Sequence, residues 1–219
     1  IASLTSLVTY FIPILALTLG GGIIADERDK GTLELYLSSP MSIGEFITGK
    51  FLGLAVALVL STIAGLGIAG IVIIIKLGFS TVMSYLLFML NSVFMGLIFL
   101  SVSFLVSILF SDRARVIAFT IFLWLFFAVL YDLGLVGLLI ITKGVVGNEV
   151  FSALLVLNPV DVYRVLNFLS IGELRVFLGL AAVELPGYMN TPVLWVITLL
   201  WVVMPLYLSY YFFKKRYLI

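Results

Sequence analysis

The sequence contains no cysteine and no histidine. The first absence excludes disulfides and thiol chemistry, and the second excludes acid–base catalysis by imidazole. Together they remove the usual ligands of soft metals, so we expect no metal site in this chain. Charge is also scarce, because 11% of the residues are Asp, Glu, Lys or Arg, where a soluble domain carries roughly a quarter. The net charge of +1 gives no reason to expect a nucleic-acid partner.

Hydrophobic residues, in contrast, make up 63% of the chain. About 20 apolar residues in a helix cross a bilayer core of ~30 Å. The apolar stretches that reach this length are residues 1–24, 51–75, 82–110, 116–139 and 193–213. They do not alternate in polarity, which excludes a barrel, and no polar stretch is long enough to enclose its own core. We therefore predict an all-α integral membrane protein with five spans, forming one domain over residues 1–219.

The Lys and Arg residues in the connections predict the orientation. One side would hold eight of the 12, namely Arg28, Lys30, Lys50, Arg113, Arg115, Lys214, Lys215 and Arg216. The other side would hold Lys76, Lys143, Arg164 and Arg175. Basic residues concentrate on the cytoplasmic side of inner-membrane proteins, so we expect the C-terminus in the cytoplasm and Ile1 outside. A cytoplasmic native N-terminus would then require a sixth helix before Ile1.

The connection over residues 140–191 is too apolar for a free loop. It is also too interrupted for a single span, by Gly147, Pro159, Gly172, Pro186 and Gly187. We expect short helices that lie at the outer membrane surface or re-enter the membrane. Asn158 and Pro159 would begin one of them, because Asn caps helices well and Pro is tolerated in the first turn. This extracellular helix would continue over residues 160–169 and carry Asp161 and Arg164.

Small residues recur at every fourth position of the second span. They are Gly49, Gly53, Ala57, Ser61, Gly65 and Ala69. Small side chains at this spacing allow helix backbones to approach closely within a membrane. We interpret them as a helix-packing seam, either within one chain or between two copies.

Polar residues within the spans are few. Asn91 and Ser92 are expected to bond across to another helix and fix its position. Asp132 is the one acid inside a span, so it faces a partner or a pathway, or else the helix ends near Tyr131 and Asp132 reaches the outer headgroups. Asn91 and Asp132 are our candidates for a substrate path. No carboxylate pair and no Ser with a nearby base indicates catalysis, so we do not expect an enzyme.

A charged interruption over residues 25–50 holds eight of the chain's ionisable side chains. Within it, GEFITGK at residues 44–50 fits the phosphate-loop pattern, but Phe51 stands where Mg²⁺ coordination requires Ser or Thr, and no strand precedes it. Ser42 and Glu45 instead fit a capping box that begins a helix. If ATP and Mg²⁺ are used, another chain must bind them.

Residues 32–39 lie between Gly31 and Pro40 and predict a short helix with Leu33, Tyr36 and Leu37 on one face. An isolated helix of two turns is marginally stable, so this helix must lean on the membrane surface or on a partner's groove. A membrane-surface helix is typically rich in Lys and Arg. Residues 26–45 contain five acids and two bases, which favours the groove.

The sequence ERDKGTLE, followed by LYLSSP and by a GK that enters the next span, resembles the intracellular loop of ABC-2 type transporter permeases. The resemblance implies a coupling helix that sits in a cleft of an ABC ATPase subunit. Its residues here are Glu27, Arg28, Gly31, Thr32, Leu33, Glu34, Tyr36, Leu37 and Pro40. It also implies six helices in the full chain, a second permease copy, and ATP-driven export.

Two further segments are similar to the permeases of nitrous-oxide-reductase maturation transporters. They are LYDLG around Asp132 and LNPVDVYR at residues 157–164. This narrower resemblance implies a periplasmic partner protein and a role in supplying a metalloenzyme.

Two other functions are open. A secondary transporter driven by an ion gradient typically shows inverted repeats and several charges at the midplane, whereas Asp132 stands alone here. A membrane anchor that transports nothing would recruit a soluble complex through the same charged loop.

Overall fold

The structure, a computed structural model, describes residues 2–38, 40–143, 145–171 and 186–217. Every regular element among these residues is a helix, which confirms the all-α prediction. Within these described ranges, five helices are long and apolar enough to cross a membrane. They are α1 (Ala2–Asp29), α3 (Ile43–Leu77), α4 (Val82–Leu109), the path from α5 to α6, and α9 (Thr191–Tyr217). Ile1, Gly172 and Arg175, which entered the predictions above, lie outside the described residues.

α3 and α4 form a long hairpin. The Ser42 hydroxyl accepts a hydrogen bond from the Glu45 N–H (3.2 Å), and the Glu45 carboxylate accepts one from the Ser42 N–H (2.8 Å). This confirms the predicted capping box at the start of α3. The helix ends at Gly78, whose φ of +87° suits glycine, and a 3₁₀ turn, η1 (Phe79–Thr81), leads into α4.

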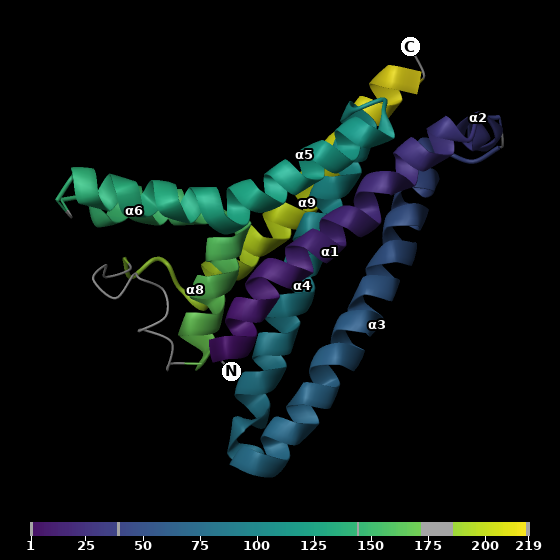
Figure 1. The fold of residues 1–219 in the computed structure, drawn as a ribbon. Helices are drawn as coiled ribbons and strands as arrows, with labels where there is room; N and C mark the ends of the chain where they lie inside the picture. Colours follow the sequence, from purple (N-terminus) through teal and green to yellow (C-terminus); the bar gives the residue numbers. More distant parts are fainter. Residues whose placement is uncertain (1, 39, 144, 172–185, 218–219) are drawn as a thin grey trace.

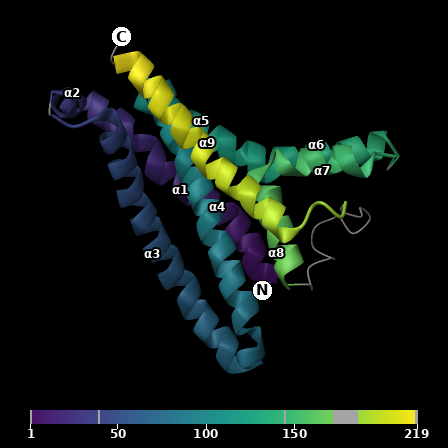
Figure 2. The same ribbon diagram turned by 180° about the vertical axis from the view of Figure 1, so that it is seen from behind.

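The fourth span is a bent path rather than one straight helix. α5 (Arg113–Leu125) passes through a π-helical segment, η2 (Phe126–Leu130), into α6 (Tyr131–Ile141). The possibility that the helix ends near Tyr131 is therefore wrong. π-helical segments are rare and widen the turn locally. Beyond η2, α6 and α7 (Asn148–Val156) project sideways from the bundle, as Figures 1 and 2 show.

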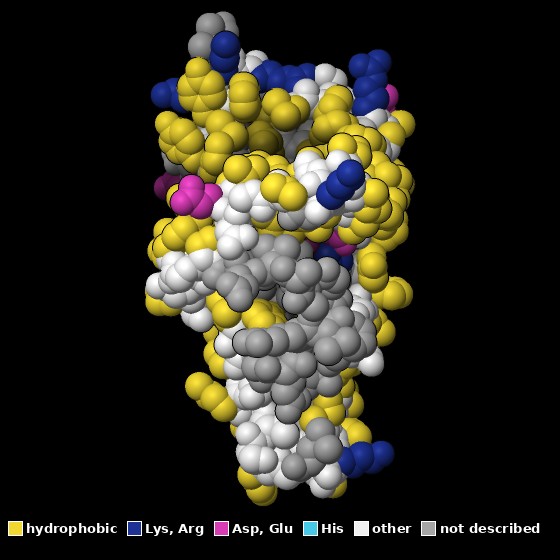
Figure 3. Space-filling model, turned by 90° about the vertical axis from the view of Figure 1, so that its left-hand side faces the viewer, with side chains coloured by type: hydrophobic (Ala, Val, Ile, Leu, Met, Phe, Trp, Pro, Cys, Tyr) yellow, Lys and Arg dark blue, Asp and Glu magenta, His cyan; other side chains and the backbone are white. Residues whose placement is uncertain are grey.

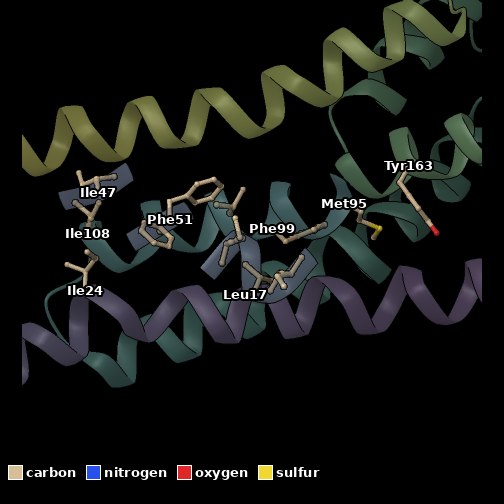
Figure 4. Packing of buried hydrophobic residues seen from close by; sticks show 14 of the residues in the cluster. Leu17, Ile24, Ile47, Phe51, Met95, Phe99, Ile108 and Tyr163 are labelled. Atoms are coloured by element: carbon tan, nitrogen blue, oxygen red, sulfur yellow. The ribbon is translucent and has the colours of Figure 1, made fainter. Parts of the chain in front are cut away.

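α4 lies at the centre of the bundle and packs against α1, α3, α8 and α9. Figure 4 shows side chains from four helices meeting there, including Leu17 of α1, Phe51 of α3, Phe99 of α4 and Tyr163 of α8. Each of them is buried. α4 is therefore the element that the other helices share.

Glycines bring the core helices close together. An added Cβ on Gly20 of α1 would lie 1.8 Å from the Ser103 hydroxyl oxygen of α4. One on Gly96 of α4 would lie 2.6 Å from a methyl carbon of Leu58 on α3. Larger residues at these positions would separate the helices.

The small-residue stripe of α3 does not take part in these contacts. Gly49, Gly53 and Gly65 are exposed, and no described atom lies within 4 Å of an added Cβ on any of them. α3 turns its larger residues, such as Phe51 and Leu58, toward the core. Among the described residues, nothing packs against these glycines, and the seam, within one chain or between two copies, stays a prediction.

The connection before α9 contains the predicted short helices, α7 and α8 (Pro159–Ile171). The Asn158 side-chain oxygen accepts a hydrogen bond from the Val160 N–H (3.0 Å), which confirms the predicted start of α8. Phe151 and Leu155 of α7 pack with Leu166 of α8 in a second, smaller core. α8 itself lies between α4 and α9.

Candidate coupling site

The predicted coupling loop forms a compact corner at one end of the bundle. α1 continues to Asp29, beyond the apolar stretch, and Gly31 then turns the chain with a φ of +70° into α2 (Thr32–Leu37). The Thr32 hydroxyl donates to the Glu27 carbonyl (3.2 Å) across this turn. The short helix is thus present over six of the eight predicted residues, and Pro40 follows it, exposed. Only a residue that tolerates positive φ fits at position 31.

The inner side of α2 packs on its own chain. Leu33 is 3% exposed and belongs to the main core, and the Tyr36 ring lies 5.4 Å from the Phe46 ring of α3. The side chain of Leu37 lies outside the described part of the structure. From the sequence, this apolar face is expected to lean on the membrane or on a partner's groove, whereas in the structure Leu33 is enclosed by its own chain. The side left open carries Glu34, Leu35 and Ser38, with Leu35 70% exposed.

Lys50 of α3 connects the three helices of the corner. It forms an ion pair with Glu27 of α1, and both side chains are mostly buried. Its ammonium also lies 5.1 Å from the ring centroid of Tyr36 and 5.2 Å from that of Phe46, within the range of a cation–π interaction. Lys50 is the lysine of the phosphate-loop pattern at residues 44–50, and it is not among the predicted coupling residues. Its position in the GK that follows the family motif was the available signal.

Two arginines from other helices cap the end of α4. Arg28 of α1 donates to the Phe110 carbonyl (2.7 Å), and Arg216 of α9 donates to the Ile108 carbonyl (2.7 Å) and to the Ser111 hydroxyl. The last carbonyls of a helix lack partners within the helix and carry partial negative charge. An arginine side chain donates hydrogen bonds to these carbonyls and brings a positive charge beside them. Arg28 and Arg216 therefore hold α1 and α9 against the end of α4. The corner that carries α2 is therefore connected to the central helix through Arg28.

The predicted outer residues meet in a second cluster, at the bend between α5 and α6. Arg164 of α8 donates to carboxylate oxygens of Asp132 on α6 and of Asp161 (3.0 Å). Asn158 donates to Asp161 (2.9 Å) and to the Phe127 carbonyl in the π-helical segment (3.0 Å). Asp132, Asn158, Asp161 and Arg164 are all predicted site residues, but no sequence pattern predicts that they contact one another. We call these four residues the Arg164 cluster.

Burial dominates the electrostatics of the Arg164 cluster. It raises the pKa of Asp161 to about 7, and the neighbouring Asp132 charge acts in the same direction. The Arg164 charge and the hydrogen bonds from Asn158 and Arg164 oppose the rise. The cluster joins α8 to the bend, with a carboxyl group that titrates near neutral pH.

A third set of polar contacts holds α8 against α4. The Asn91 amide donates to the Asn167 side-chain oxygen (3.1 Å), and the hydroxyls of Ser92 and Tyr163 lie 3.2 Å apart. All four side chains are buried. The predicted bonding of Asn91 and Ser92 to another helix is confirmed. The role of Asn91 and Asp132 in a substrate path stays a prediction.

Known proteins are similar to this chain over almost its whole length. A family model described as "ABC-2 family transporter protein" matches residues 2–218. A protein of Stutzerimonas stutzeri named "Probable ABC transporter permease protein NosY" is 33% identical over 224 residues, which cover 99% of this chain and 80% of the relative. A protein of the same name from Pseudomonas aeruginosa is 34% identical over 225 residues, with the same coverage.

Proposed function

Because the chain belongs to the ABC-2 family of transporter proteins, as a membrane permease subunit, we propose that a separate ABC ATPase docks on the open side of α2 and drives export. That subunit would bind the ATP and Mg²⁺. One observation carries the proposal. α2 is fixed on its inner side by Leu33 and Tyr36, while its outer side presents Glu34, Leu35 and Ser38 at the end of the molecule.

The contacts of α2 suggest how movement would pass into the membrane. ATP-driven closure of two ATPase subunits would displace α2, and the Glu27–Lys50 ion pair would move the ends of α1 and α3 with it. Arg28 would transmit the same displacement to the end of α4. The bundle would respond as a two-state element whose equilibrium nucleotide biases.

We propose that two copies of the chain pair through the outward stripe of α3. Its small residues Gly53, Ala57 and Ser61 are exposed along an apolar helix, a pattern that permits close approach of a second helix in lipid. The 219-residue sequence has no cysteine, so Gly53→Cys introduces a single thiol into it. Disulfide-linked dimers in membranes would support the pairing, with exposed Leu86→Cys on α4 as the control. Equal cross-linking at both sites would argue against it.

We propose that the α2 end faces the cytoplasm, in the inner membrane. The ends of α1, α4 and α9 meet there through Arg28 and Arg216. Figure 3 shows Lys and Arg side chains gathered along one end, above a band of hydrophobic side chains. Basic residues favour the cytoplasmic side of such proteins, which also places the C-terminus there.

We further propose that the exported species serves maturation of a metalloenzyme, in concert with a periplasmic partner protein. The segments that resemble permeases of nitrous-oxide-reductase maturation transporters supply all four residues of the Arg164 cluster. Expression of this chain in a Stutzerimonas stutzeri strain that lacks its NosY-named permease tests the role. Restored nitrous-oxide reduction would support it, and a correctly inserted chain that restores none would contradict it.

The docking proposal is tested by a charge reversal on α2. Glu34→Arg should abolish stoichiometric co-purification of the ATPase and its stimulation in liposomes, because the partner's groove would then meet the wrong charge. Glu149→Arg on α7 reverses an equally exposed acid far along the chain and serves as the control. Gly31→Pro should act like Glu34→Arg, since Pro cannot adopt the φ of +70°. Normal co-purification of both α2 variants would place the ATPase elsewhere.

A further inference from the structure

The π-helical segment η2 changes which backbone groups bond to one another in the fourth span. The Tyr131 N–H donates to the Phe126 carbonyl, five residues earlier. In an α-helix, the same N–H would donate to the Phe127 carbonyl, four residues earlier. The Phe127 carbonyl therefore loses its α-helical donor, and lipid supplies no replacement.

The first residue of the α8 corner takes the place of this donor. The side-chain amide of Asn158 donates to the Phe127 carbonyl (3.0 Å), and the Asn158 side chain is fully buried. Its side-chain oxygen at the same time accepts from the Val160 N–H and begins α8. One residue thus both starts α8 and compensates the π-helical turn.

The π-helical register also places Asp132 against Arg164 of α8, with which it forms an ion pair. The neighbouring Tyr131 hydroxyl donates to the Leu154 carbonyl of α7 (2.6 Å). One residue of an α-helix adds a rotation of ~100°. A change of η2 from π-helical to α-helical would therefore rotate α6 by about that angle relative to α5 and turn Asp132 away from Arg164. Both contacts, like the bond from Asn158, favour the π-helical form.

Packing holds α6 only weakly in this orientation. Over the described Tyr131–Ile141, no residue is buried, and Leu135 and Leu139 are partly buried against the second core. An added Cβ on Gly134 or Gly137 would meet no described atom within 4 Å. In Figure 1, α6 leaves the bundle sideways from the bend. The bonds from α8 are thus a main part of what fixes α6.

We propose that η2 is a two-state switch in the fourth span. In the state described here, η2 is π-helical and is held by Asn158 and Arg164. In the other state, residues 126–130 are α-helical, and α6 is rotated and released from α8. The states differ by few bonds, so small changes in free energy shift their populations. π-helical segments occur frequently at functional sites. The switch requires neither the ATPase nor a second copy of the chain.

Distances between two spin labels in the purified chain test the switch. The 219-residue sequence has no cysteine, so Val136→Cys on α6 and Leu86→Cys on α4 provide two exposed labelling sites. Labelled chains are diluted with unlabelled chains, so that distances within one chain are measured. We expect one main distance when no other residue is changed.

Two conservative variants should populate the second state. Asn158→Ser keeps an oxygen that caps α8 but has no amide to reach Phe127, and loss of one ordinary hydrogen bond shifts an equilibrium by about fivefold. Asp132→Asn removes the charge from the ion pair, and bonds to charged groups are stronger. A second, resolved distance should therefore rise about fivefold in Asn158→Ser and at least about tenfold in Asp132→Asn.

The control removes a bond of α8 that does not involve η2. Tyr163→Phe loses the contact with the Ser92 hydroxyl of α4 (3.2 Å) and should keep the original distance. An equal second population in this control would show general loosening of α8 and overturn the switch. Broadening of the main distance without a second one would overturn it as well. Unchanged distances in folded Asn158→Ser and Asp132→Asn would show that η2 is fixed.

Discussion

α3 and α4 are neighbouring helices of one hairpin, and both are long and strongly apolar, yet they lie in different environments. In the most apolar stretch of each helix, 78% of the residues are buried in α4, whereas 11% are buried in α3. α4 carries polar side chains such as Asn91 and Ser103, which bond to other helices or to its own backbone. α3 carries a stripe of small residues whose glycines, Gly49, Gly53 and Gly65, have no neighbour packed on them among the described residues.

The difference shows which signals locate the centre of a membrane bundle. Apolar content does not, because lipid and protein interior are equally apolar surroundings. Buried hydroxyl and amide groups do, since they need partners that lipid cannot supply. Small residues allow close packing without causing it, so Gly20 lies in a tight contact and Gly53 does not.

The largest expected difference in stability is between the same substitution at a buried glycine and at an exposed glycine. Gly20→Leu should destabilise the folded chain by about 3 kcal/mol, because the new side chain would overlap Ser103 and push α1 from α4. Gly53→Leu, on the open face of α3, should change the stability by less than about 0.5 kcal/mol. Thermal unfolding of both purified variants measures this. Similar losses would remove the distinction between the two helices.

The Arg164 cluster extends the comparison to charge. Asp132→Leu should lower the stability by about 2 kcal/mol, because it leaves the mostly buried Arg164 with one carboxylate partner instead of two. Asp132→Leu/Arg164→Leu should recover part of this loss, as expected for coupled residues. A double-mutant cycle of unfolding temperatures gives the coupling. Strictly additive losses would mean that the ion pair does not hold α8 to the bend.

Asn91→Leu should have a smaller effect, about 1 kcal/mol, since hydrogen bonds between membrane helices are worth about that much. The substitution leaves the Asn167 side-chain oxygen without its donor. Leu90→Asn is the matched substitution on the exposed side of α4, where the new amide would face lipid. It should impair membrane insertion instead, as measured by the yield of folded protein. Unchanged stability in Asn91→Leu would contradict the structural role of this bond.

The last prediction is a pH dependence of the stability. The pKa of Asp161 is about 7 in the folded chain, against an ordinary value of 3.8. At pH values between these two, the folded state therefore keeps a proton on Asp161 that the unfolded state has lost. Stability should therefore fall as the pH rises from about 5 to about 7. Asp161→Asn should flatten this slope of the unfolding temperature. Parallel curves for wild type and variant would show that Asp161 is ionised throughout.

The sequence predicted the elements better than their contacts. The five spans, the Ser42 capping box and the Asn158 helix start follow from local signals, apolar runs and capping side chains, that lie close together in the chain. The ion pair of Asp132 with Arg164 joins residues from two helices, and the contact of Lys50 with Tyr36 depends on how α2 folds back. Such contacts depend on the packing of distant elements, which no local pattern specifies. The outward direction of the α3 stripe was unpredictable for the same reason.

The central claim is that a partner ATPase covers the open side of α2. Because the chain has no cysteine, Leu35→Cys provides a single thiol at a 70% exposed position of α2, and Ile75→Cys provides one at a 78% exposed position at the far end of α3. The rate of maleimide labelling is measured with and without the co-purified ATPase. We predict that the ATPase slows labelling at position 35 at least about tenfold and leaves position 75 unchanged. Equal labelling of position 35 in both preparations would contradict the account.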